Sequence, residues 1–135
     1  MSRLLVDTSA YSAWVRGHPP VQEPVQRASE IYMSVIVLGE LLAGFRGGSR
    51  RRENETFLRD FLSSPRVQVL GIDEETAEPY AAIQHELRQR GTPVSPNDLW
   101  IAATAYQHGL RVLTTDGDFR KIPQVLVDYI EPPMT

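Results

Sequence analysis

Short apolar runs recur along the chain, separated by longer segments in which apolar residues follow a helical spacing. A strand that is buried on both faces is apolar throughout, so the short runs predict strands at 3–6, 31–33, 67–70, 110–113 and 125–129. The longer segments predict helices at 8–15, 21–30, 35–45, 49–64, 74–90 and 96–108. Strands that alternate with helices predict an α/β fold with a parallel-rich central sheet of about four or five strands, flanked by helices on both faces.

Several helix boundaries have local signals. Thr8 or Ser9 is placed to cap the first helix, and Asp73 is placed to cap the long helix that follows the third strand. The helices at 35–45 and 49–64 are joined by a glycine-containing turn. This short connection predicts a helical hairpin.

Residues 95–119 have the clearest local pattern of the chain. Ser95 is suited to cap a helix, and Gly109 is suited to the left-handed conformation that ends one. Apolar residues up to Tyr106 follow a helical spacing and the opposite face is apolar too, so the helix is expected to be covered on most sides. The apolar run after it leads to Asp116. That carboxylate therefore lies at the end of a predicted buried strand, where open α/β sheets bind ligands.

Four acidic side chains occupy corresponding positions in these elements. Asp7 and Asp116 follow the carboxyl ends of two predicted strands. Asp98 lies in the first turn of a covered helix, and Glu40 interrupts a helix that is otherwise apolar. Each lacks an obvious local cation. We expect the four carboxylates to converge at one edge of the sheet, because parallel strands end at the same edge.

Such a convergence of carboxylates has a defined chemistry. Clustered carboxylates repel one another, and a raised pKa or a bound divalent cation relieves the repulsion. Oxygen ligands without histidine or cysteine favour Mg²⁺ or Mn²⁺, ions that bind substrate phosphates. The pattern therefore predicts metal-assisted hydrolysis of phosphodiester bonds.

Each acidic residue also has a structural interpretation. Asp98 follows Ser95 at the spacing of a capping box. Asp7 could bind its own backbone in a turn. Asp116 and Asp118 belong to "TTDGDF", a segment with a turn glycine, so either carboxylate could be structural.

The composition limits the class of protein. A chain of 135 residues with 41% hydrophobic content is expected to form a single domain over 1–135. The formal net charge of −3 argues against bulk attraction to nucleic acid, so a nucleic-acid partner would need a local basic patch. The absence of cysteine and of a bilayer-length apolar run indicates a cytoplasmic protein without a membrane segment. The candidate patch for phosphates or a partner consists of Arg46, Arg50, Arg51 and Arg52.

Three segments resemble a known family. "LLVDTSA", "SVIVLGELLAG", "NDLWIAATAYQHGLRVLTTDGDF" and their spacing resemble PIN-domain ribonucleases, in particular the VapC-type toxins of bacterial toxin–antitoxin pairs. The resemblance covers essentially the whole chain and implies a single PIN-like domain. It implies metal-binding and catalytic roles, by position, for Asp7, Glu40, Asp98 and Asp116, with Asp118 as an alternative or additional metal ligand and Ser9 and Thr114 as supporting hydroxyls. Thr115 departs from the family pattern, since many members carry Arg there.

The same resemblance implies a function. It implies Mg²⁺- or Mn²⁺-dependent cleavage of RNA, a homodimer, and inhibition by a cognate antitoxin protein. Two alternatives share the fold: a housekeeping RNA-processing nuclease, and a non-catalytic module that binds RNA or protein. A phosphatase with Asp7 as nucleophile is disfavoured, because Ser9 occupies the place of its second acid and Lys121 is the only lysine.

Overall fold

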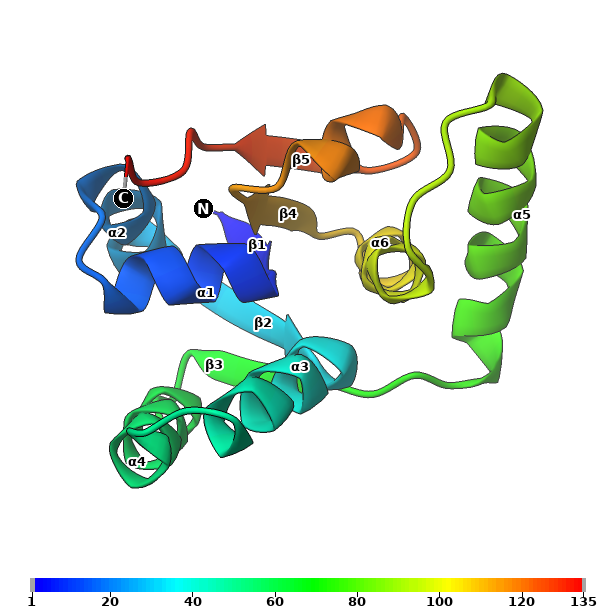
Figure 1. The fold of residues 1–135 in the computed structure, drawn as a ribbon. Coiled ribbons are helices and arrows are strands. Elements are labelled where there is room, and N and C mark those ends of the chain that lie inside the picture. The colour runs from blue at the N-terminus through cyan, green and yellow to red at the C-terminus, as the bar shows by residue number, and fades with distance from the viewer. Residues whose placement is uncertain (1, 135) are drawn as a thin grey trace.

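A computed structural model describes residues 2–134, in which five strands form one fully parallel sheet (Figure 1). The strand order is β3-β2-β1-β4-β5, and every neighbouring pair is parallel. The strands are β1 (Arg3–Val6), β2 (Glu30–Ser34), β3 (Val67–Leu70), β4 (Arg111–Thr114) and β5 (Leu126–Tyr129). All five expected strands are present, which confirms the predicted α/β class.

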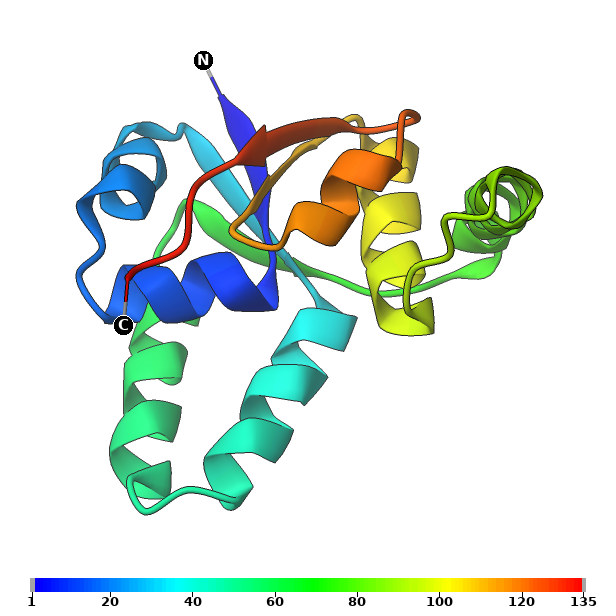
Figure 2. The same ribbon diagram turned by 45° about the horizontal axis from the view of Figure 1, so that its top comes forward.

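Helices flank this sheet on both sides. They are α1 (Thr8–Val15), α2 (Pro19–Arg27), α3 (Val35–Arg46), α4 (Arg51–Leu62), α5 (Glu74–Arg90), α6 (Pro96–His108) and the 3₁₀ helix η1 (Gly117–Lys121). Figure 1 shows α1 and α2 on one side of the sheet and α6 on the other, with α5 outside α6. The predicted hairpin of α3 and α4 is confirmed and projects away from the sheet (Figure 2). No helix among residues 2–134 has the length and apolarity needed to cross a membrane.

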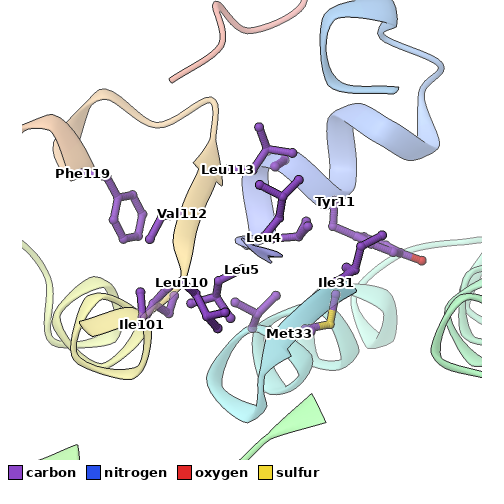
Figure 3. Close-up of a cluster of buried hydrophobic side chains, with 14 of the residues drawn as sticks. Leu4, Leu5, Tyr11, Ile31, Met33, Ile101, Leu110, Val112, Leu113 and Phe119 are labelled. Carbon is purple, nitrogen blue, oxygen red and sulfur yellow. The ribbon is translucent and has the colours of Figure 1, made fainter. Parts of the chain in front are cut away.

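The core lies between the central strands and the helices that cover them. Leu5, Ile31 and Val112, from three adjacent strands, are fully buried, and Ile101 of α6 packs against the same cluster (Figure 3). Close packing of this kind leaves little freedom for the strand ends. The residues that follow β1 and β4 are therefore held on a rigid support.

Helix α6 begins and ends as its sequence predicts. The Ser95 hydroxyl accepts a hydrogen bond from the Asp98 backbone, and Gly109 ends the helix with a φ of 65°. The long helix α5 likewise starts from a capping box between Asp73 and Thr76. The expectation that the covered face reaches Tyr106 is wrong. That side chain is 58% exposed, because the covered surface of α6 ends before its last turn.

The strand order places a crevice between β1 and β4. From β1 the chain runs outward through β2 and β3, then returns to the other side of β1 for β4 and β5. A reversal of this kind leaves a crevice at the carboxyl ends of the two inner strands. The Asp7 backbone N–H donates to the carbonyl of Leu113 at 3.2 Å, so the pairing of β1 with β4 continues up to the crevice.

Candidate active site and metal centre

Asp7 directly follows the carboxyl end of β1 and also begins α1. Its side chain is 2% exposed, and its Oδ1 accepts a hydrogen bond from the Ala10 backbone N–H at 2.8 Å. The cap expected at Thr8 or Ser9 is therefore wrong. Asp7 is the last extended residue before the helix, so its carboxylate is the group that reaches the free N–H of the first turn.

Two hydroxyls fix the orientation of the Asp7 carboxylate. Thr114 Oγ1 donates to Oδ2 at 2.6 Å, and Ser9 Oγ donates to Oδ1 at 2.9 Å. Each hydroxyl also accepts a backbone N–H, Thr114 from Asp116 at 2.8 Å and Ser9 from Thr115 at 3.0 Å. The segment after β4 is therefore tied directly to the segment after β1.

Three further carboxylates, from α6 and from the segment after β4, lie close to one another. One oxygen each from Asp98, Asp116 and Asp118 lies within 4.8 Å of the others, the only such acidic group found among residues 2–134. Asp116 Oδ1 accepts the Asp118 backbone N–H at 2.9 Å, which begins η1 and sets the two side chains next to each other. The donor set is all oxygen, which suits a hard divalent cation. Asp116 and Asp118 both belong to this trio.

Asp98 joins the trio through its side chain. Only the Ser95 half of a capping box is formed at α6, through the Asp98 backbone N–H at 3.2 Å. The Asp98 carboxylate lies close enough to those of Asp116 and Asp118 to share a cation with them. Burial and then repulsion from Asp116 raise the pKa of Asp98 to about 6. Burial also raises the pKa of Asp7 to about 6, although the hydrogen bond from Thr114 opposes the shift.

The carboxylates of the site receive little compensation from basic side chains. Asp7, Glu40, Asp98 and Asp116 take part in none of the ion pairs found among residues 2–134. Asp118 has one cationic partner, Lys121, at 2.9 Å. A divalent cation would relieve the remaining repulsion.

Glu40 approaches the site from α3. The Thr8 hydroxyl donates to its Oε1 at 2.6 Å, and the Asn97 amide donates to its Oε2 at 3.0 Å. Neither donor was predicted as a site residue, and Thr8 was expected only as a possible helix cap. Their positions offered a signal, because Thr8 directly follows Asp7 and Asn97 directly precedes Asp98.

The predicted basic patch does not join the carboxylates. Arg46, the nearest of its members in sequence to Glu40, lies six residues further along α3, about 9 Å along the helix axis. The others lie at the α3–α4 turn, at the end of the hairpin away from the sheet (Figure 2). Arg50 pairs there with Glu53 at 2.7 Å and Arg51 with Glu55 at 3.0 Å.

The sequence and the fold of this chain resemble those of known proteins. The family profile of the PIN domain matches residues 4–125. The chain belongs to the PIN-domain family. The PIN domain described here is 39% identical over 95 residues to Ribonuclease VapC4 of Mycobacterium tuberculosis, a match that covers 70% of this chain and 73% of that protein.

Two further similarities extend over nearly the whole PIN domain. The tRNA(fMet)-specific endonuclease VapC of Salmonella typhimurium is 30% identical over 131 residues, covering 95% of this chain and 98% of that protein. A chain of the DNA-bound VapBC structure from Salmonella typhimurium superposes with a TM-score of 0.82 and 29% identity, covering 96% of this chain and 98% of that one. The resemblance to VapC-type PIN-domain ribonucleases is thereby confirmed.

Proposed function

We propose that this PIN domain is a metal-dependent endoribonuclease that hydrolyses phosphodiester bonds in RNA, and that it is the toxin of a toxin–antitoxin pair. The observation that supports it best is the trio of Asp98, Asp116 and Asp118, whose oxygens lie within 4.8 Å of one another beside the buried Asp7. The relatives named as VapC ribonucleases support RNA as the substrate.

The residues of the trio fit Mg²⁺ or Mn²⁺, both of which prefer carboxylate oxygens and retain several waters. We assign Asp98, Asp116 and Asp118 as the residues that hold the ion, with Asp7 and Glu40 completing the acidic site. When bound, the ion supplies Lewis-acid stabilisation of the phosphodiester and acidifies a neighbouring water.

The protein's own contribution is to hold charges in fixed positions. Asp7 is oriented by Ser9 and Thr114, so its carboxylate does not need to reorganise during the reaction. Glu40 accepts one hydrogen bond on each oxygen, from Thr8 and Asn97, and each oxygen keeps a further lone pair. We assign to Glu40 the orientation of the attacking water.

We further propose that the domain acts in the cytoplasm, as a homodimer, and that a cognate antitoxin protein inhibits it. The similar VapBC structure from Salmonella typhimurium supports the antitoxin, since VapBC is named as a family of toxin–antitoxin systems. The exposed arginines of the α3–α4 turn are a candidate contact for RNA or for an acidic part of the antitoxin. They are Arg46, Arg50, Arg51 and Arg52.

A cleavage assay tests the proposal. The purified protein is incubated with an unstructured RNA and millimolar Mg²⁺ or Mn²⁺. We expect cleavage that is abolished by chelation and by Asp7→Asn, and that is retained in Asp60→Asn, which alters an exposed carboxylate of α4. Cleavage that survives both chelation and Asp7→Asn would exclude the mechanism.

A further inference from the structure

Lys121 is the one basic residue that forms an ion pair with the acidic site in the described part of the chain. Its Nζ lies 2.9 Å from Oδ1 of Asp118, and the Asp118 carboxylate is a member of the trio with Asp98 and Asp116. The acidic site must bind the polyanionic backbone of RNA, yet all its other charged side chains are negative. The ammonium group therefore stands at the boundary between the carboxylates and solvent.

The fold fixes the position of Lys121 without confining its side chain. Side chains three residues apart eclipse in a 3₁₀ helix, so η1 puts Asp118 and Lys121 on the same face. Phe119 and Ile122, on either side in sequence, are buried and anchor the turn. The Lys121 side chain itself is 44% exposed, so it can move between Asp118 and a ligand that approaches from solvent.

The energetics favour such a movement. An exposed ion pair stabilises a protein only slightly, so the ammonium is released from Asp118 at little cost. A cation held by Asp118 competes with Lys121 for the same carboxylate. Lysine is a compact charge on a flexible stem, which suits a phosphate group whose position changes along the RNA.

We propose that Lys121 is a phosphate-binding residue of the active site, which pairs with Asp118 until an RNA phosphate takes its place. This inference rests on the proposed nuclease function. Arg120, its neighbour, is a matched control, because its guanidinium lies 4.0 Å from the centre of the Tyr129 ring and forms no ion pair with the carboxylates among residues 2–134.

The proposal predicts effects of opposite sign in Lys121→Gln. Removing the positive charge should tighten Mn²⁺ binding about twofold to fivefold, because a competitor for Asp118 is lost. Binding of a short single-stranded oligoribonucleotide should weaken by a similar factor. The slope of log affinity against log salt should become shallower by about 0.7, the value for one lost phosphate contact on a single strand.

The experiment measures Mn²⁺ binding by calorimetry and RNA binding by fluorescence anisotropy, the latter in the Asp7→Asn background so that the RNA stays intact. Lys121→Arg should retain the salt slope, and Arg120→Gln should change neither affinity. If Lys121→Gln weakens the binding of both Mn²⁺ and RNA, the ion pair has only a structural role and the proposal is overturned. If the variant changes neither affinity, the pair is only a solvated surface contact and the proposal is likewise overturned. If the unmodified chain neither binds nor cleaves RNA, the proposed function itself has failed.

Discussion

The Thr114 hydroxyl donates a 2.6 Å hydrogen bond to the carboxylate of Asp7, a residue 107 positions earlier in the chain, and it accepts the backbone N–H of Asp116 at 2.8 Å. One small side chain thus joins the ends of the two strands that border the crevice. It fixes the orientation of the buried Asp7 carboxylate and positions the backbone of Asp116.

Thr114→Val removes both hydrogen bonds while keeping the shape of the side chain. The variant removes the shortest hydrogen bond to the Asp7 carboxylate, which keeps its bonds from Ser9 and the Ala10 backbone N–H. It also leaves the Asp116 N–H without its acceptor, so we expect a loss of about 1–3 kcal/mol of unfolding free energy. RNA cleavage should fall about 10–100-fold, as for other residues that support metal ligands. Urea unfolding and a cleavage time course measure the two effects. Thr114→Ser, which keeps the hydroxyl, should retain most of both, and equal damage in the two variants would contradict this role.

The N-terminus of α6 has a helix cap at Ser95 and a proposed metal ligand at Asp98, and the two roles can be tested separately. Ser95→Ala removes the cap and should cost about 1 kcal/mol of stability while leaving metal binding intact. Asp98→Asn keeps the backbone N–H that is capped, so it should not lower the stability of the metal-free protein, but it should abolish the stabilisation by Mn²⁺. Thermal melts with and without Mn²⁺ test both variants. If Asp98→Asn still binds Mn²⁺, Asp98 serves only to start the helix and is not a metal ligand.

The stability of the metal-free protein should depend on pH in a defined direction. Burial holds the pKa values of Asp7 and Asp98 near 6, above their ordinary 3.8, so the folded chain binds protons more tightly than the unfolded chain. Their contribution to stability is therefore fully present below about pH 4 and is lost as the pH rises to about 6. The double variant Asp7→Asn/Asp98→Asn should gain about 2 kcal/mol over the parent across this window, after allowance for solvent screening at the half-exposed Asp98. Urea titrations in chelator from pH 4 to 7.5 measure the difference, and a constant difference would contradict it.

Divalent metal should stabilise the folded chain. An ion that binds only the native state adds about 2.7 kcal/mol at a hundredfold excess over its dissociation constant. We therefore expect Mg²⁺ and Mn²⁺ to raise the melting temperature, and Asp116→Asn and Asp118→Asn each to reduce the rise. Asp60→Asn should leave it unchanged. No rise at millimolar metal would count against a shared site.

The donors to Glu40 should affect turnover more than binding. Thr8→Val and Asn97→Ala each free one Glu40 oxygen, so the carboxylate becomes less well oriented. We expect kcat to fall about tenfold while KM for RNA and the metal-induced rise in melting temperature stay the same. Steady-state cleavage kinetics distinguish this outcome from a loss of folding, which would lower the melting temperature as well.

The sequence alone determined the elements and the candidate chemistry. Apolar runs marked the five strands, and caps at Ser95 and Asp73 marked helix starts, because these signals depend on neighbouring residues only. The motifs around Asp7, Asp98 and Asp116 also identified the family. Local patterns were sufficient for these conclusions.

Only the tertiary structure decided which acidic side chains lie close enough to share a cation and which lie outside that group. It placed Asp118 with Asp98 and Asp116 in the close trio, left Glu40 held by Thr8 and Asn97, and kept the arginines of the α3–α4 turn away from the carboxylates. Side-chain direction and distance across the crevice depend on how β1, β4, α3 and α6 pack together. That packing joins residues far apart in the chain, which no local pattern records.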